Sequence, residues 1–336
     1  MKIIFNHKFE DLISIDNLLL AWQEFIKGKR NKKDVQIFSF RLMDNILSLH
    51  EDLKNKTYRH GGYQRFKIND PKPRTIHKAS VRDRLLHHAV YHILYLFFDK
   101  TFIPDSFSCR DNKGTHKAIK KIREYASIVS KNNTKACWIL KCDIRKFFAS
   151  IDQNILINIL EQYIPDKDIV NLLKEVIFSF KPNGLPLGNL TSQLFANVYL
   201  NEFDQFAKHK LKIKHYIRYA DDFVILSENK NYLKTTLEPI SSFLQNVLEL
   251  ATHPDKIFIK TLSSGIDFLG WVNFFDHRIV RKITKLRAVR NIEKESTNYA
   301  TISSYFGLLK HGNTHKVKEN ILERVCRENL DSISCL

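Results

Sequence analysis

Hydrophobic residues recur at helical spacing over the first sixty residues of the chain. Residues 6–60 contain few helix-breaking residues, and Phe40, Met43, Ile46 and Leu49 lie three residues apart on one face. This pattern predicts a set of N-terminal helices. The same periodicity returns later and predicts further helices at residues 83–99, 144–164, 191–210 and, in a basic stretch, 284–336.

Alternating or continuous apolar runs predict strands between these helices. The predicted strands lie at residues 63–68, 136–143, 216–219 and 223–226. Strands and helices mixed in this way indicate an α+β fold. An aromatic stripe on the helix at 191–210 is expected to belong to the core, and it consists of Phe195, Tyr199, Phe203 and Phe206.

The net charge of the chain adds information about its partners. Lys and Arg number 54 against 36 Asp and Glu, which gives a formal charge of +18. Each Lys or Arg that docks on a phosphate releases a counterion, so a nucleic acid is the favoured partner. The alternative is that the basic residues only keep the protein soluble.

The apolar and cysteine patterns predict a cytoplasmic protein. The longest apolar run, residues 89–98, is shorter than the about 20 residues that cross a bilayer, and acidic residues near the start argue against a signal peptide. No CxxC pair occurs, so we expect a reducing compartment, no disulfide framework and no zinc site. The five cysteines are Cys109, Cys137, Cys142, Cys326 and Cys335.

Two adjacent aspartates lie between the apolar strands predicted at 216–219 and 223–226. Asp221 and Asp222 fall at the predicted turn, and Asp143 ends another predicted strand. Buried carboxylates are costly unless they are paired or bound to metal. Three of them at neighbouring strand ends suit two Mg²⁺ ions about 3.5–4 Å apart, as in two-metal phosphoryl transfer. An exposed Asp-Asp turn is the alternative.

Two loops flank this predicted site. In "GLPLGNLTSQ", Gly184 and Gly188 allow the backbone to approach a base pair or nucleotide closely, although a simple interhelical loop would look the same. The segment 58–84 repeats basic residues around a predicted turn. These side chains suit the binding of a triphosphate or a template backbone. The alternative is that the segment is a solvated hairpin.

These motifs together give the chain a family resemblance. "YADD" (Tyr219–Asp222) is similar to the YxDD box of reverse transcriptases, and "KCDIRKFF" resembles their other aspartate motif. The stretches "KPRTIHKASVRDRLLHHAV", "SFSCRDNKGTHKAI", "HPDKIFI" and "IDFLGW" resemble further motifs of the family in the same order. The resemblance runs from about Asp70 to Trp271 and implies a right-hand polymerase fold.

The resemblance implies roles for individual residues. Asp143, Asp221 and Asp222 match the metal ligands, with Mn²⁺ as a possible substitute for Mg²⁺, and Lys256 matches a candidate general acid, although Lys260 is close by. Phe148 matches the aromatic residue that excludes a 2′-hydroxyl, whereas Phe147 is expected in the core. The remaining implied dNTP-binding residues are Arg74, Lys72, Arg82, Leu187, Gly188 and Gln193. The implied primer or template contacts are Tyr219, Leu269, Gly270, Lys310 and His311.

The loop after Pro186 resembles one subgroup of the family. Many reverse transcriptases have a QGxxxSP pattern, whereas Leu187 and Gln193 give this chain LGNLTSQ, which resembles the enzymes of diversity-generating retroelements. "SYFGLLKHGNTHKV" resembles their thumb. Leu187 stands in place of a glutamine whose amide can hydrogen-bond near the new base pair, a contact worth about 0.5–1.5 kcal/mol. Its loss is expected to relax the discrimination between correct and incorrect nucleotides; the alternative is that Leu187 only packs. The resemblance implies errors concentrated at template adenines.

The function expected from the sequence is RNA-directed DNA synthesis for mutagenic retrohoming. The implied partners are a template-repeat RNA, its cDNA, dNTPs and a small, basic, oligomeric accessory protein, in a bacterial or phage-encoded system. The alternatives are a defence-associated or other retroelement reverse transcriptase, and a polymerase-fold factor that only binds RNA. The expected domains are N-terminal helices and fingers (1–130), palm (131–275) and thumb (276–336).

Overall fold

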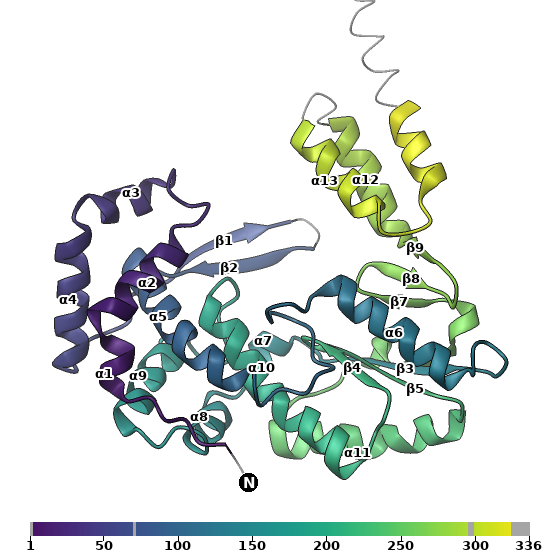
Figure 1. The fold of residues 1–336 in the computed structure, drawn as a ribbon, viewed down its shortest axis with the longest axis horizontal. Helices are drawn as coiled ribbons and strands as arrows, with labels where there is room; N and C mark the ends of the chain where they lie inside the picture. Colours follow the sequence, from purple (N-terminus) through teal and green to yellow (C-terminus); the bar gives the residue numbers. More distant parts are fainter. Residues whose placement is uncertain (1–2, 70–71, 295–298, 324–336) are drawn as a thin grey trace, which may run out of the picture. The chain divides into compact units, whose positions relative to one another are not determined.

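The fold combines many helices with short antiparallel sheets (Figure 1). A computed structural model describes residues 3–69, 72–294 and 299–323. The described α-helices are α1 (Phe9–Ile13), α2 (Ile15–Phe25), α3 (Lys33–Phe40), α4 (Leu42–Lys54), α5 (Val81–Phe98), α6 (Thr115–Val129), α7 (Phe147–Ser150), α8 (Gln153–Glu161), α9 (Lys167–Phe178), α10 (Leu190–Gln205), α11 (Lys230–Leu248), α12 (Lys282–Lys294) and α13 (Tyr299–Leu309).

The strands form three sheets within the described residues. A hairpin pairs β1 with β2, a four-stranded sheet has the order β4-β5-β3-β6, and a three-stranded sheet has the order β7-β8-β9. The strands are β1 (Gln64–Ile68), β2 (Arg74–Lys78), β3 (Trp138–Asp143), β4 (Tyr216–Tyr219), β5 (Asp222–Ser227), β6 (Phe258–Thr261), β7 (Ile266–Phe268), β8 (Trp271–Asn273) and β9 (Arg278–Val280).

The chain divides into two compact units. Unit 1 comprises residues 1–114, 142–223 and 236–257, and unit 2 comprises 115–141, 224–235 and 258–336. The division falls inside β3 and β5, so both strands contribute residues to each unit.

The core of unit 1 forms around α10. Helix α5 packs against α2 and α10, and the aromatic side chains Phe195, Tyr199 and Phe203 of α10 are buried. Burying each such ring stabilises the fold by about 1.5–3 kcal/mol. Phe206, at the start of a π-helical turn, is half-buried and stacks on Phe243. The predicted core stripe is therefore confirmed.

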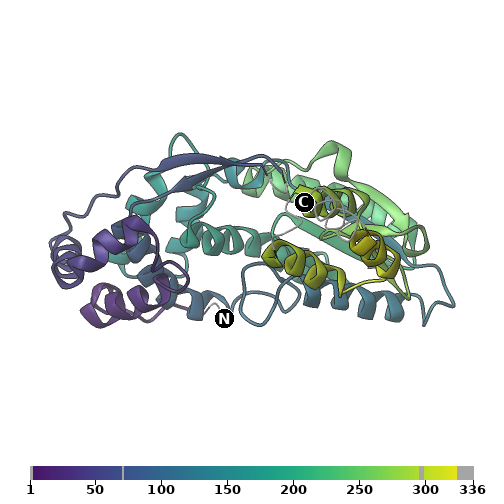
Figure 2. The ribbon, with the colours of Figure 1, turned by 90° about the horizontal axis from the view of Figure 1, so that it is seen from above.

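Polar caps define where the helices of unit 1 begin. The Ser80 hydroxyl accepts a hydrogen bond from the Asp83 amide at the start of α5. The Asp152 carboxylate accepts from two amides at the start of α8. Such caps satisfy amides that have no partner within the helix. The β1–β2 hairpin extends from these helices as a two-stranded ribbon (Figures 1 and 2).

Unit 2 contains two short hairpins and the C-terminal helices α12 and α13. Leu269 and Gly270 connect β7 to β8, and their φ angles of 52° and 86° suit the two-residue turns that match strand twist. The Gly270 carbonyl accepts a hydrogen bond from the Arg281 amide at 3.1 Å. This contact ties the turn to the start of α12.

Most predicted elements are confirmed, with shifts of a few residues at their ends, but the helix predicted at 144–164 is two helices, α7 and α8, separated by extended backbone at Ile151 and Asp152. The predicted strands at 136–143, 216–219 and 223–226 correspond to β3, β4 and β5. Cys109, Cys137 and Cys142 are free thiols, whereas Cys326 and Cys335 lie outside the described residues, as do Asp70 and the end of the predicted thumb. In the described part of the chain, no helix combines the length and apolarity needed to cross a membrane.

Candidate active site

The Asp221-Asp222 pair lies at the turn of the β4–β5 hairpin, as the sequence predicted. Ala220 turns the chain with a φ of 53°, a left-handed conformation that costs energy in a residue with a Cβ. Both aspartates are half-buried. The hairpin therefore presents two carboxylates where its strands meet.

Asp143 reaches the same place from the end of β3. The Ile144 amide donates a hydrogen bond to the Asp221 carbonyl at 3.3 Å, and the Asp143 carbonyl accepts from the His253 amide at 2.7 Å. Asp143 itself is buried. The structure thus brings together the three predicted metal ligands, here called the aspartate cluster (Asp143, Asp221 and Asp222).

Lys256 is the cation that faces the aspartate cluster. Its ammonium lies 2.7 Å from the Asp143 Oδ1, and the Lys256 side chain is 41% exposed. The neighbouring candidate, Lys260, lies instead over the ring of Phe258 within unit 2, at 5.0 Å from its centroid. Lys256 therefore has the geometry of a proton donor beside the cluster, whereas Lys260 is engaged by its own neighbour.

The carboxylates of the cluster perturb one another. Burial raises the pKa of Asp221 to about 6, and the nearby charges of Asp222 and Asp143 add to this rise while Lys256 opposes it. A divalent cation would remove that repulsion, and carboxylate oxygens are the ligands that Mg²⁺ prefers. The residues present therefore fit a metal ion, although no group of three or more His, Cys, Asp or Glu among the described residues is already arranged as a metal site.

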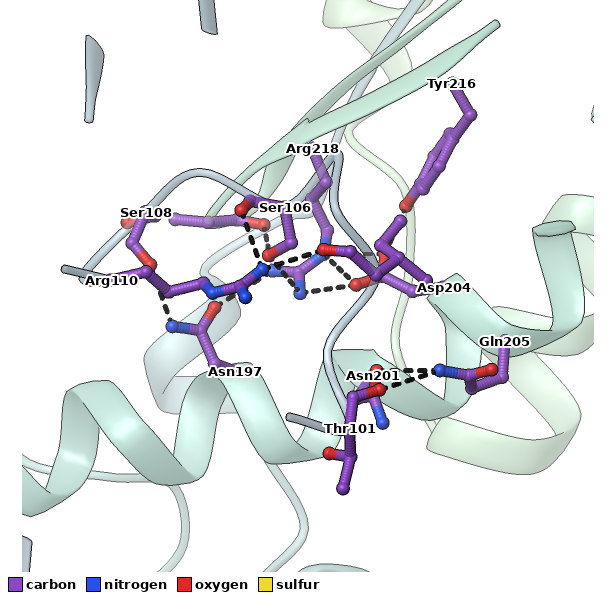
Figure 3. A network of polar contacts seen from close by, with 12 residues as sticks. Thr101, Ser106, Ser108, Arg110, Asn197, Asn201, Asp204, Gln205, Tyr216 and Arg218 are labelled. Carbon is purple, nitrogen blue, oxygen red and sulfur yellow. Dashed lines mark hydrogen bonds and ion pairs between the residues drawn. The ribbon is translucent and has the colours of Figure 1, made fainter. Parts of the chain in front are cut away.

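A buried ion pair contacts the β4–β5 turn (Figure 3). Arg218 and Asp204 are fully buried, and the guanidinium donates to both carboxylate oxygens, at 2.6 Å from Nη2 to Oδ2 and 2.8 Å from Nε to Oδ1. The same guanidinium donates to the Ala220 carbonyl at 3.2 Å. Arg218 therefore links the core directly to the residue that turns the chain.

Further polar groups complete this network. The Tyr216 hydroxyl donates to Asp204 at 2.6 Å, and the Arg218 guanidinium also donates to Asn197 and Ser106. Burial lowers the pKa of Arg218 and the Asp204 charge raises it, with a net rise. The guanidinium is therefore held in its charged form, with its donors directed at fixed acceptors.

Phe148 lies against the loop after α9. Phe148 is half-buried and meets the buried ring of Phe147 edge-on, with 5.5 Å between centroids. The Leu185 amide donates to the Phe148 carbonyl at 2.7 Å. A Cβ on Gly184, whose φ is 84°, would lie 2.6 Å from that carbonyl oxygen. Glycine is thus required here for contact within the protein.

The next part of this loop runs beside β2. The His77 amide donates to the Leu187 carbonyl at 2.9 Å, and a Cβ on Gly188 would lie 2.7 Å from the Ile76 side chain. Leu187 is half-buried, and Gln193 is exposed on the first turn of α10. The loop therefore joins the β1–β2 hairpin to α10.

The basic residues proposed to bind a triphosphate differ in their surroundings. Lys72 and Arg74 are exposed at the β1–β2 turn and the start of β2. Arg82 instead forms an ion pair with Asp52, and its guanidinium lies 5.3 Å from the centroid of the Tyr58 ring. Arg82 thus has a structural contact of its own.

The predicted primer or template residues belong to both units and are described separately. Tyr219 is half-buried at the end of β4 in unit 1. In unit 2, Leu269 and Gly270 form the β7–β8 turn, and Lys310 and His311 are exposed after α13. Their roles stay predictions.

Three residues that contact the elements of the site, Arg218, Asp204 and Gln153, were not predicted from the sequence. Arg218 had a detectable signal, because an arginine inside the apolar run "YIRYADDFVIL" requires a buried partner. That partner, Asp204, had no comparable signal on its helix. Gln153 had no signal in the sequence either. Its amide donates to the carbonyls of Ile177, Phe180 and Gly184 and so anchors the loop between α9 and α10.

Comparison with known sequences agrees with this geometry. Residues 67–273 match the family described as "Reverse transcriptase (RNA-dependent DNA polymerase)". Protein YkfC of Escherichia coli is 24% identical over 66% of this chain and 68% of its own length. The group II intron-encoded protein LtrA of Lactococcus lactis is 24% identical over 76% of this chain, which spans about half (53%) of LtrA.

A solved structure shows the same fold. Telomerase from Candida albicans, solved with a fragment of telomeric RNA, matches with a TM-score of 0.54 at 13% identity, covering 84% of this chain and 57% of that one. The likeness confirms the α+β fold class and the polymerase fold expected from the sequence.

Proposed function

Since the chain belongs to the reverse transcriptase family of RNA-dependent DNA polymerases, we propose that it copies a template-repeat RNA into cDNA for mutagenic retrohoming. The observation that carries the polymerase part is the aspartate cluster. Asp143 and Asp221 come from separate strands, yet the Ile144 amide contacts the Asp221 carbonyl directly. Lys256 lies beside the same carboxylates.

The aspartate cluster is proposed to hold two Mg²⁺ ions, which Mn²⁺ can replace. When bound, such ions lower the pKa of an attacking 3′-hydroxyl and neutralise charge on the leaving pyrophosphate. The Lys256 Nζ lies 2.7 Å from the Asp143 Oδ1. In our proposal Lys256 donates its proton to the leaving pyrophosphate.

The surroundings of the cluster are proposed to select the nucleotide. The backbone of Phe148 is held by the Leu185 amide, its half-buried ring meets Phe147 edge-on, and in our proposal this ring excludes a 2′-hydroxyl. Arg74 and Lys72 are exposed and therefore accessible to a triphosphate. Arg82 would need to exchange its Asp52 partner for phosphate, so we assign it a smaller contribution to triphosphate binding than Arg74 and Lys72.

The assignment to diversity-generating retroelements rests on the loop sequence. Leu187 stands where many family members have a glutamine that hydrogen-bonds near the new base pair, and its side chain is half-buried. Gln193 replaces a proline at the exposed first turn of α10. We propose that the apolar Leu187 relaxes discrimination at template adenines. The same assignment implies a small, basic, oligomeric accessory protein.

The experiment that tests this function is primer extension on RNA with Mg²⁺ and dNTPs, followed by sequencing of the product. Errors concentrated at template adenines, and reduced in Leu187→Gln, support the proposal. Leu185→Met is the control, because this neighbouring loop residue is buried and the change conserves volume. Faithful product, or an unchanged error spectrum in Leu187→Gln, contradicts the subtype and favours a defence-associated or other retroelement enzyme.

A further inference from the structure

Unit 2 contains a pocket of about 770 Å³ whose lining residues all belong to that unit. They come from α6, from Leu262 after β6, from the segment around β8 and β9, and from the turn after α13. Here this cavity is called the α6 pocket, and the lining residues that matter below are His116, Arg123, Phe274, His277, Arg278 and His311. The aspartate cluster does not contribute to it.

Two guanidinium groups share the wall of the α6 pocket. Arg123 Nη2 donates to the Asp276 carbonyl at 2.6 Å, and Arg278 lies over the ring of Trp271, 5.1 Å from its centroid. Neither arginine forms a salt bridge within the described residues. Burial and the charge of Arg123 lower the pKa of Arg278. Like charges held together in this way are stabilised when an anion binds between them.

The acidic residues of the pocket are already engaged elsewhere. The Asp276 carboxylate lies 2.7 Å from the His277 ring, and Glu124 pairs with Lys121 at 3.0 Å. Both carboxylates therefore have a cationic or hydrogen-bonding neighbour of their own. The two arginines instead donate to backbone carbonyls, Arg123 to that of Asp276 and Arg278 to that of His311, so neither guanidinium is neutralised by a carboxylate in the described part of the chain.

Flat rings line the same cavity. His116 and His311 lie with centroids 3.8 Å apart, and Phe274 stacks on His277 at 4.6 Å with 10° between planes. Burial, together with the charges of His311 and Arg278, lowers the pKa of His116, so that ring is neutral at pH 7. Rings beside guanidinium groups are what unpaired bases stack on in RNA-binding proteins.

We propose that the α6 pocket binds one unpaired nucleotide of a single-stranded RNA, with its phosphate between Arg123 and Arg278 and its base among the rings. The volume lies within the range of about 300–1,000 Å³ of small-ligand sites, which suits one nucleotide. A protein of charge +18 favours a polyanion as the source of that phosphate. The inference goes beyond the proposed function, because it assigns a nucleotide pocket in unit 2 of which only His311 was among the expected primer or template contacts.

The test uses the full chain and a short single-stranded RNA carrying a photoreactive 4-thiouridine. Arg123→Gln is expected to weaken RNA binding about tenfold and to reduce the slope of log K against log salt by about 0.7, as for one lost phosphate contact. Crosslinks to peptides that contain Phe274 or His311 should fall in parallel. Lys131→Gln is the matched control, because it removes an exposed charge of unit 2 that does not line the pocket.

Each alternative outcome overturns the proposal. Wild-type affinity and salt slope in Arg123→Gln, or crosslinks that map only outside the pocket, exclude an RNA site here. If free nucleoside triphosphate or duplex RNA competes with the crosslink to the pocket as well as unlabelled single-stranded RNA does, the occupant is not an unpaired nucleotide. Lys120→Gln, a second exposed change on α6, repeats the measurement if Arg123→Gln misfolds. The test measures RNA binding and crosslinking and not DNA synthesis, so failure of the proposed polymerase function would not change its result.

Discussion

Substituting Asn for Asp204 tests whether the buried ion pair holds the β4–β5 turn in place. The Asp204 carboxylate accepts hydrogen bonds from Tyr216 and from the Nε and Nη2 of Arg218, and both members of the pair are 0% exposed. Asn keeps the volume but leaves the Arg218 charge buried without a counter-charge. Removing one partner of a buried pair costs about 3–5 kcal/mol. We therefore expect Asp204→Asn to lower the free energy of unfolding by about that amount.

The assay is urea unfolding followed by circular dichroism, with Asp168→Asn as the control. Asp168 pairs with Lys56 at 2.7 Å, but these side chains are 38% and 62% exposed, so its loss should cost about 0–1 kcal/mol. Primer extension by the folded Asp204→Asn fraction should also decline, because Arg218 supports the Ala220 carbonyl. A loss of stability no larger than that of Asp168→Asn would refute the reasoning.

Three further predictions concern other parts of the chain. Gly312→Ala should lower stability by about 1–3 kcal/mol, because its Cβ would lie 2.2 Å from a Trp271 ring carbon. Gly307→Ala meets no atom within 4 Å and should stabilise α13 by about 0.5–1 kcal/mol. Thermal unfolding compares the two variants, and equal effects on stability would contradict the packing of Gly312 against Trp271. Lys256→Met should lower kcat about 10²–10⁴-fold while Lys260→Met leaves kcat near wild type, and single-turnover kinetics showing the reverse would reassign the proton donor. Chelation with EDTA should abolish DNA synthesis without changing the circular dichroism spectrum, and synthesis that survives chelation would contradict a metal-dependent site.

The sequence predicted the parts of the site that break a local pattern. Aspartates inside apolar strands are visible without any structure, since burying a carboxylate demands a reason, and the ordered motifs around them indicated the class of enzyme that the family match confirms. The glycines of the loop were also recognisable. Their partners were not, because Gly184 approaches the backbone of Phe148 and Gly188 approaches Ile76, contacts that only the fold creates.

The positioning residues show what the sequence could not reveal. Asp204 lies on a helix in which a polar residue is ordinary, so its pairing with Arg218, 14 positions later, had no local signal. The α6 pocket is a similar case. Arg123 and Arg278 read as solvated charges along the chain, and only the packing of α6 near β9 brings them to one cavity. The fingers, palm and thumb boundaries and the roles of individual residues stay predictions.

The central claim is that the aspartate cluster performs metal-dependent DNA synthesis on RNA. The measurement that tests it most directly is primer extension by Asp221→Asn beside wild type, with binding of the same RNA measured in parallel. We predict that Asp221→Asn abolishes synthesis but retains RNA affinity, because it removes a metal ligand and no phosphate contact. Asp16→Asn, an exposed change on α2, should leave both unchanged. Near-normal synthesis by Asp221→Asn would contradict the assignment of the active site.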